Sequence, residues 1–240
     1  MSGETSTLDG FLGGRLRIAQ PKRGFRAGHD TVLLAAAVPA EAGSRVLELG
    51  AGAGVASLCL AARVEGASVL GIEIDPDLVA LANENAARNG MGTRVRFEAA
   101  DAAAMSGGPA FDHVFFNPPF HSPTGQESPN PARDRAMRDS TNAVSEWTRI
   151  ALALTKPGGT VTAIAGAGRA SDLLAAREGA VLFPLFPHRG DVPKRAIVQI
   201  VKGSTAPFRA ATGLILHEAD GRNTEGTEAV LREGRALRLV

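Results

Sequence analysis

Four consecutive residues, Asn117-Pro118-Pro119-Phe120, follow a predicted strand whose last residues, 114–116, are apolar, as is typical of a buried strand. Because proline fixes the backbone, the Pro118 carbonyl and the Asn117 side-chain oxygen are preset hydrogen-bond acceptors. Two such acceptors can hold both N–H bonds of a planar amino group and favour the pyramidal geometry that frees its lone pair. Phe120 can stack on a flat ring, which is worth about 1–3 kcal/mol for a nucleobase. The tetrad therefore indicates chemistry on a planar amino nitrogen, carried by alignment rather than by a strong base.

A glycine-rich loop lies upstream of the tetrad. An apolar stretch reaches Glu48 and runs into Gly50, Gly52 and Gly54 before a helical segment. Glycine lets the backbone turn sharply and approach a ligand closely. A dinucleotide-binding loop would need its third glycine at position 55, where this chain has Val55. The spacing therefore argues against a nicotinamide enzyme.

Acidic residues close the next two predicted strands. Glu73, followed by Ile74, stands where a carboxylate can accept hydrogen bonds from both hydroxyls of a ribose. Asp101 can accept a hydrogen bond from an adenine amino group, while the amide of Ala102 donates to a ring nitrogen. Open α/β sheets bind their ligands at the carboxyl ends of parallel strands, so these residues and the glycine loop predict one nucleoside site.

A parallel sheet is needed to bring these residues together. From residue 45 the sequence alternates short β-branched runs with Ala- and Leu-rich stretches, which is the signature of βαβ units. The predicted strands are residues 45–49, 68–73, 94–99, 112–117 and 159–165, followed by a closing antiparallel pair at 180–186 and 195–203. We therefore expect a Rossmann-like α/β fold with about seven strands, helices on both faces and an antiparallel last strand.

Helices are expected between the strands, each with its own start and stop signals. They are residues 31–38 capped by Asp30, 55–64, the stretch from Asp75-Pro76 to Gly90, 144–154, and a stretch capped by Ser171 that runs through residue 177. We interpret residues 1–9 as a mobile tail, residues 1–40 as that tail plus a segment that closes the cofactor pocket, and residues 41–240 as the rest of one domain. Residues 120–139 form a long Pro-, Ser-, Gly- and Arg-rich loop, and loops of this length are often functional.

Composition excludes several other classes of protein. The 240 residues are 44% hydrophobic and 21% charged, enough for a full core. The longest apolar stretch, residues 31–40, is about half of a membrane span, and no charged leader precedes it, so we expect a cytoplasmic protein. The single cysteine, Cys59, cannot form an internal disulfide, and no Cys/His spacing predicts a metal site. With 26 Lys+Arg against 25 Asp+Glu, any nucleic-acid site must be a local patch.

In their order, the motifs over residues 45–165 resemble the class I S-adenosylmethionine-dependent methyltransferases. The tetrad resembles the N-P-P-[YF] motif of members that methylate planar amino groups in adenine, cytosine or glutamine. The resemblance implies S-adenosyl-L-methionine as cofactor, with the three loop glycines at its methionine end, Glu73 at its ribose and Asp101 at its adenine. The cofactor-binding residues that we expect are Gly28, Asp30, Glu48, Gly50, Gly52, Gly54, Glu73, Ile74, Asp101, Ala102 and Asn117.

A second pattern precedes the glycine loop. Gln20, Gly24, Arg26 and Asp30, followed by Leu33-Leu34, resemble the Q-x-x-x-G-x-R-x-x-x-D-x-x-L-L pattern of the bacterial tRNA1(Val) adenine-N-methyltransferase family of small-domain methyltransferases. This resemblance implies methylation of the exocyclic nitrogen of an adenine in RNA, with tRNA as the partner. It also implies that Gly28 and Asp30 help to close the cofactor pocket and that Arg26 orders the segment or approaches the substrate. The expected catalytic residues are Asn117, Pro118, Pro119 and Phe120, and the expected substrate-binding residues are Arg26, Phe120, His121, Arg138, Lys194 and Arg195.

Basic residues gather in three stretches, within residues 15–26, 133–138 and 188–195. If all three face the tetrad they form a rim for phosphates, whereas each alone is a solvated face. Two alternatives stay open. A glutamine methyltransferase would use the same tetrad, although such enzymes carry a helical domain before the core and only residues 1–44 precede the first predicted strand here. A catalytically silent protein could keep the cofactor fold. The sequence fixes neither the oligomeric state nor the particular RNA.

Overall fold

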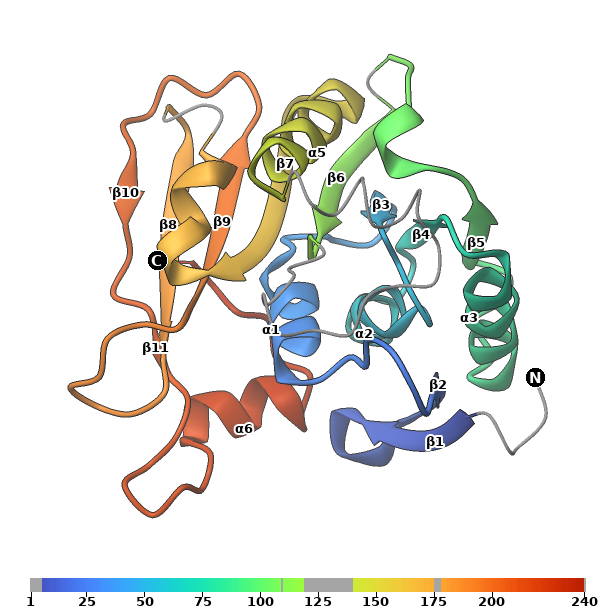
Figure 1. The fold of residues 1–240 in the computed structure, drawn as a ribbon, viewed down its shortest axis with the longest axis horizontal. Coiled ribbons are helices and arrows are strands. Elements are labelled where there is room, and N and C mark those ends of the chain that lie inside the picture. Colours follow the sequence, from blue (N-terminus) through green and yellow to red (C-terminus); the bar gives the residue numbers. More distant parts are fainter. Residues whose placement is uncertain (1–5, 109, 119–139, 175–177, 240) are drawn as a thin grey trace.

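A nine-stranded sheet forms the centre of the computed structural model, which describes residues 6–108, 110–118, 140–174 and 178–239. Figure 1 shows its strands from left to right in the order β10-β8-β9-β7-β6-β3-β4-β5, and β11 also pairs with β8. The strands are β3 (Arg45–Leu49), β4 (Ser68–Glu73), β5 (Val95–Ala99), β6 (Phe111–Phe116), β7 (Thr155–Gly166), β8 (Ala180–Phe186), β9 (Arg195–Val201), β10 (Arg209–Ala210) and β11 (Leu214–Ile215). Strands β3 to β7 are parallel, and β9 is antiparallel to β7 and β8. The Rossmann-like arrangement is confirmed, with two-residue strands added at the β8 edge.

Helices cover both faces of the sheet, and the strand residues alternate between the two resulting cores. The helices are α1 (His29–Ala37), α2 (Val55–Arg63), α3 (Pro76–Arg88), α5 (Ser140–Leu154) and α6 (Glu225–Leu231). Phe115 belongs to the core under α1, α2, α3 and α6, whereas its neighbour Phe116 belongs to the core under α5. Both rings are fully buried, and each burial stabilises the fold by about 1.5–3 kcal/mol. Among the described helices, none is long and apolar enough to cross a membrane.

The chain before α1 contains a β-hairpin, which corrects the expectation of a tail through residue 9. Strands β1 (Ser6–Phe11) and β2 (Leu16–Pro21) pair antiparallel. Strand β1 belongs to a two-stranded sheet and includes polar residues such as Asp9. Its sequence therefore lacks the apolar periodicity by which a strand is recognised.

Two side-chain amides, one in α3 and one at its C-cap, hold the other edge of β2. Asn85 Oδ1 accepts a hydrogen bond from the Ala19 amide (2.8 Å), and its Nδ2 donates to the Ala19 carbonyl (2.9 Å) and to the Ala53 carbonyl in the glycine loop (3.0 Å). One turn later, Asn89 makes the same pair of bonds with the amide and carbonyl of Arg17, both at 3.0 Å. The two asparagines thus take the place of a neighbouring strand and tie the hairpin to the glycine loop.

Three local expectations about helix ends and strand starts are corrected by the structure. Helix α1 begins at His29 with Gly28 as its N-cap, so Asp30 lies inside the first turn and does not cap it. Ser171 lies within a 3-10 helix, η3 (Ala167–Leu173), rather than at a helix start. Strand β7 begins directly after α5, at Thr155, earlier than predicted. In contrast, α3 opens at Asp75-Pro76 as expected, and Asp75 caps it by accepting from the amides of Asp77 and Leu78.

Candidate active site

The glycine loop and the tetrad begin side by side at the centre of the sheet. Leu49 and Phe116, the last residues of β3 and β6, are partners in the parallel ladder, so Gly50 and Asn117 leave the sheet from adjacent positions. The strand order reverses between β3 and β6, and a crevice at such a switch point is where open α/β sheets bind ligands. Glu73 ends the neighbouring strand β4 at the same edge. The structure therefore brings together the two motifs that the sequence analysis singled out.

The glycine loop adopts a backbone that other residues tolerate poorly. Gly52 has φ 55° and Gly54 has φ 83°, both in the left-handed region. A Cβ on Gly54 would lie 2.5 Å from the ring of Phe97, whereas nothing lies within 4 Å of a Cβ built on Gly52. The loop is thus packed tightly on β5 at its end and open above its middle, where a ligand can approach the backbone.

Glu73 fastens this loop to the next corner of the sheet. One carboxylate oxygen accepts from the amide of Gly52 (2.9 Å), and the other accepts from the amides of Ile74 (2.9 Å) and Asp75 (3.1 Å). A carboxylate offers about four acceptor positions, so ribose hydroxyls would share this group with three backbone donors. The contact between Glu73 and a ribose stays a prediction, and the carboxylate also has a structural role that sequence reasoning missed.

Glu48, near the end of β3, is buried and hydrogen-bonded to α2. Its carboxylate accepts hydrogen bonds from the amide of Ser57 (3.0 Å) and from the Ser57 hydroxyl in the first turn of α2. Burial raises the pKa of Glu48 to about 8, and the nearby charge of Glu73 raises it further, while the two bonds from Ser57 lower it. Glu48 therefore braces α2 beneath the glycine loop, and its predicted contact with the cofactor stays untested.

The predicted adenine ledge lies beyond Glu73. Asp101 is exposed, and its carboxylate caps a short 3-10 helix, η2 (Ala102–Ala104), by accepting from the Ala103 amide (2.8 Å). Ile74 is 59% exposed although it is apolar, so a flat ring placed there would cover it. The adenine contacts of Asp101, Ala102 and Ile74 stay predictions that this arrangement supports.

Asn117 and Pro118 are the tetrad residues that the structure describes. Asn117 is half-buried, and within the described part of the chain its side chain has no hydrogen-bond partner; Pro118 is buried. Pro119, Phe120, His121, Arg138 and the rest of the predicted loop 120–139 lie outside the described residues.

Trp147 of α5 packs next to the start of the glycine loop and next to Phe116, the residue before the tetrad. Sequence reasoning did not single it out. Its ring packs edge-on against Phe116, with centroids 5.8 Å apart. The same ring would lie 2.8 Å from a Cβ on Gly50, so only glycine fits there. It is the single tryptophan of the chain, and its spacing on an amphipathic helix indicates only a core position.

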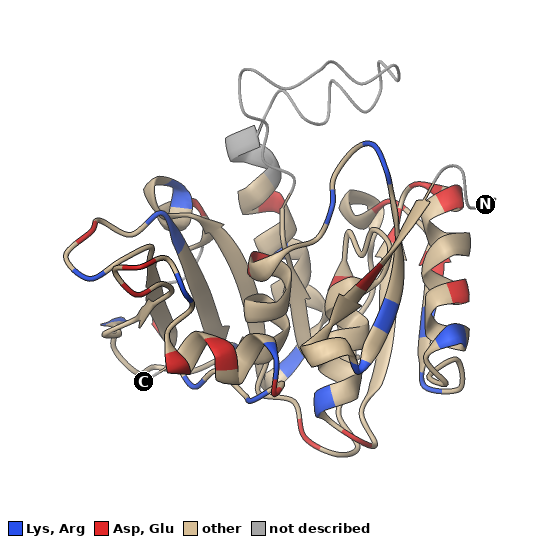
Figure 2. Ribbon diagram, turned by 90° about the horizontal axis from the view of Figure 1, so that it is seen from below, with Lys and Arg blue, Asp and Glu red and all other residues tan. Residues whose placement is uncertain are grey.

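The expected substrate cations differ in how they are used. Arg26 donates to the hydroxyl of Thr7 and the carbonyl of Pro21, both at 2.8 Å, and pairs with Asp9 at 2.6 Å, so it orders the N-terminal segment. Arg195 pairs with Asp30 (2.8 Å). Lys194 is exposed and makes no ion pair with the described residues. Figure 2 shows Lys and Arg interspersed with Asp and Glu rather than gathered on one broad face, so attraction of RNA would have to be local.

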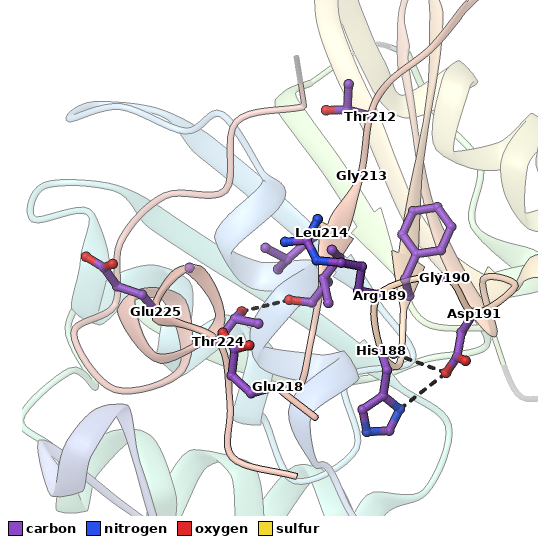
Figure 3. Close-up of a pocket in the computed structure, with 13 residues that line it drawn as sticks. His188, Arg189, Gly190, Asp191, Thr212, Gly213, Leu214, Glu218, Thr224 and Glu225 are labelled. Atoms are coloured by element: carbon purple, nitrogen blue, oxygen red, sulfur yellow. Dashed lines mark hydrogen bonds and ion pairs between the residues drawn. The ribbon is translucent and has the colours of Figure 1, made fainter. Parts of the chain in front are cut away.

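A surface hollow of about 620 Å³ lies apart from these residues (Figure 3). It lies between the β8–β9 turn, β11 and the start of α6, and its lining mixes Arg189 with Asp191, Glu218 and Glu225. None of the predicted catalytic or cofactor-binding residues lines it, although His188 and Arg189 of the third basic stretch do, so the candidate site remains at the switch point.

Residues 26–162, more than half of the chain, match the family model of the methyltransferase small domain. The chain belongs to this family. S-adenosylmethionine is therefore its cofactor. The site fits this compound, because the space above Gly52 is open and exposed Ile74 stands next to Glu73 at the predicted ribose and adenine positions.

Relatives and a solved structure agree with this assignment. The tRNA1(Val) (adenine(37)-N6)-methyltransferase of Enterobacter sp. (strain 638) is 31% identical over 131 residues, and the chain spans about half the length of that relative, 53%. The protein of the same name from Porphyromonas gingivalis (strain W83) is 31% identical over 215 residues, which cover 82% of this chain and 83% of the relative. A predicted O-methyltransferase from Agrobacterium tumefaciens has a TM-score of 0.73 and 24% identity, covering 87% of this chain and 98% of its own, which shows the shared fold.

Proposed function

We propose that this methyltransferase transfers the methyl group of S-adenosylmethionine to the exocyclic amino nitrogen of an adenine in RNA, with tRNA as the substrate. The observation that carries the proposal is the pairing of Leu49 with Phe116, from which Gly50 and Asn117 depart next to each other. This adjacency supports a cofactor pose in which the methionine end would lie beside the acceptor tetrad. Two relatives that are 31% identical to this chain carry the name of a tRNA adenine methyltransferase.

The chain would hold the acceptor amine rather than activate it with a strong base. S-adenosylmethionine supplies a methyl group on a sulfonium, which is a good leaving group. Asn117 Oδ1 and the Pro118 carbonyl would each accept a hydrogen bond from one N–H of the adenine amino group. These two hydrogen bonds would localise the nitrogen lone pair and aim it at the methyl group. The buried ring of Pro118 keeps its carbonyl fixed, so little reorganisation is needed in the transition state. The methylated nitrogen then loses a proton to water.

Further parts of the proposal concern the protein as a whole. We infer that residues 41–240 form the methyltransferase core and that residues 1–40 close the cofactor pocket. The tie between Asn85, Ala19 and Ala53 supports this division of roles, because it fastens the N-terminal hairpin to the glycine loop. An enzyme acting on tRNA would work in the cytoplasm.

The test is methyl transfer from radiolabelled S-adenosylmethionine to total RNA and total protein from a strain that lacks the enzyme. We expect label in the tRNA fraction, recovered as N6-methyladenosine after digestion to nucleosides, and none with the Asn117→Ala variant. Label recovered in protein as N-methylglutamine would replace the proposal with the glutamine alternative. Cofactor binding without label in either fraction would indicate a catalytically silent protein.

A further inference from the structure

The loop between β2 and α1 has a rigid base. Gln20 is buried, and its side chain spans the loop base by accepting from the Ala27 amide (2.8 Å) and donating to the Ala27 carbonyl (3.4 Å). The same side chain donates to Asp9 (2.8 Å), which also pairs with Arg26. Arg26 in turn donates to the Pro21 carbonyl. These bonds close residues 21–27 into a braced loop, although the loop has no regular secondary structure of its own after Pro21.

The tip of this loop, Lys22-Arg23-Gly24-Phe25, projects into solvent. All four residues are exposed, and the ring of Phe25 is 73% exposed. Gly24 has φ 92°, a left-handed turn that suits glycine. Neither Lys22 nor Arg23 makes an ion pair with the described part of the chain. The fold thus presents an aromatic ring and two uncompensated cations on a support that holds them in place.

Both ends of the loop are fixed at the edge of the sheet that carries the active site. At the start, Ala19 of β2 shares Asn85 with Ala53 of the glycine loop. At the far end, Asp30 of α1 pairs with Arg195, the residue of β9 opposite the last residue of β7. The elements on either side of the loop are therefore tied to the glycine loop and to the start of β9, both at the carboxyl edge of the parallel strands.

We propose that this loop tip is a contact site for single-stranded RNA, in which Phe25 stacks on a base next to the target adenine and Lys22 and Arg23 bind the flanking phosphates. An exposed aromatic ring beside lysine and arginine is the combination that binds unpaired nucleotides, because every base has a face that can stack and every phosphate carries charge. This inference rests on the proposed RNA substrate and adds a substrate-positioning residue outside the tetrad.

The test compares Phe25→Ala, Phe25→Trp and Leu8→Ala in the full chain. Leu8 is the matched control, because it is also an exposed apolar residue (48%) of the same hairpin, and on β1 it points to the face opposite Thr7 and Asp9, which hold Arg26. Binding is measured by fluorescence anisotropy with a labelled tRNA anticodon stem–loop, and S-adenosylhomocysteine binding by calorimetry. We expect Phe25→Ala to raise Kd for the stem–loop by about five-fold or more, Phe25→Trp to restore binding, and Leu8→Ala to leave it unchanged.

The two cations give a second readout. The slope of log affinity against log salt should become shallower by about 1.4 in a Lys22→Ala, Arg23→Ala double variant, since each phosphate contact to a single strand contributes about 0.7. With an active wild type, the role of the loop would be overturned by an unchanged salt slope in the double variant or by an unchanged RNA affinity of Phe25→Ala. It would also be overturned if Phe25→Ala weakened only S-adenosylhomocysteine binding. A wild type that neither binds nor methylates the stem–loop would overturn the proposed function, and the loop's role with it.

Discussion

Arg195 Nε lies 2.8 Å from Asp30 Oδ2, and this ion pair joins the first turn of α1 to the first residue of β9 across 165 positions of sequence. The sequence patterns assign Asp30 to the cofactor and Arg195 to the substrate. In the structure the two side chains bind each other, so either contact with a ligand would have to compete with their pairing. The pair also fixes the start of α1, directly after the loop that follows β2.

We expect that Asp30→Asn and Arg195→Gln act through one shared interaction. Each change should lower the free energy of unfolding by at most about 1 kcal/mol, because the side chains are 37% and 48% exposed. Each should also raise KM for RNA, and the double variant should differ little from either single one. The measurement is a double-mutant cycle on KM and on urea unfolding. Additive effects would show that the two residues act independently.

Glu73→Gln should weaken cofactor binding by loosening the glycine loop. A glutamine has one acceptor oxygen, so it cannot serve Gly52 on one side and the amides of Ile74 and Asp75 on the other. We expect a rise of about ten-fold or more in Kd for S-adenosylhomocysteine, since bonds to a charged acceptor contribute about 1.5–3 kcal/mol. Calorimetry measures it. The matched control is Glu98→Gln on the neighbouring strand β5, an exposed residue whose replacement should leave Kd unchanged; equal affinities for wild type and Glu73→Gln would refute the role.

Asn117→Ala should reduce turnover far more than it reduces cofactor affinity. The amide of Asn117 acts on the acceptor nitrogen, and its loss removes one of two preorganised acceptors, which costs on the order of 10²–10³ in kcat. The measurements are single-turnover methyl transfer and calorimetry with S-adenosylhomocysteine. Parallel losses in both would place Asn117 on the cofactor instead of the substrate.

Local sequence signals predicted the central strands well, because each predicted run is β-branched and lies between turn residues. The adjacency of the two motifs also followed from their order, since the glycine loop and the tetrad end strands of one parallel sheet. The hairpin β1–β2 did not follow, because one edge of β2 is held by Asn85 and Asn89. These residues lie 66 and 72 positions from their partners in β2, Ala19 and Arg17. The internal pairing of Asp30 with Arg195 is likewise a tertiary contact that no local pattern encodes.

The two asparagines give a graded test of how the hairpin is held. Asn85 is fully buried, so Asn85→Ala leaves polar groups of Ala19 and Ala53 without partners or water, and we expect a loss of about 3 kcal/mol or more in unfolding free energy. Asn89 makes the same bonds to Arg17 but is half-buried, so water can replace it and the loss should be about 1 kcal/mol. Urea denaturation compares them. Equal losses would mean that the bonds to β2 do not decide the difference.

Glu48 should make the stability of the fold fall as pH rises through neutrality. Its pKa is raised from 4.5 to about 8 by burial, so the native state keeps a proton that the unfolded chain releases near pH 4.5. Between these two values the native state binds more protons, and its stability decreases by up to about 1.4 kcal/mol for each unit of rising pH.

Glu48→Gln keeps an acceptor for Ser57 but cannot titrate, so its unfolding free energy should fall less than that of the wild type from about pH 5.5 to about pH 7.5. Burial lowers the pKa of His113, so just below the ordinary histidine pKa this residue makes stability rise with pH. The effect is the same in the wild type and in Glu48→Gln, so it cancels when the two proteins are compared. Urea unfolding across this range measures the difference, with Glu98→Gln expected to parallel the wild type; parallel curves for Glu48→Gln would show that Glu48 titrates alike in the folded and unfolded states.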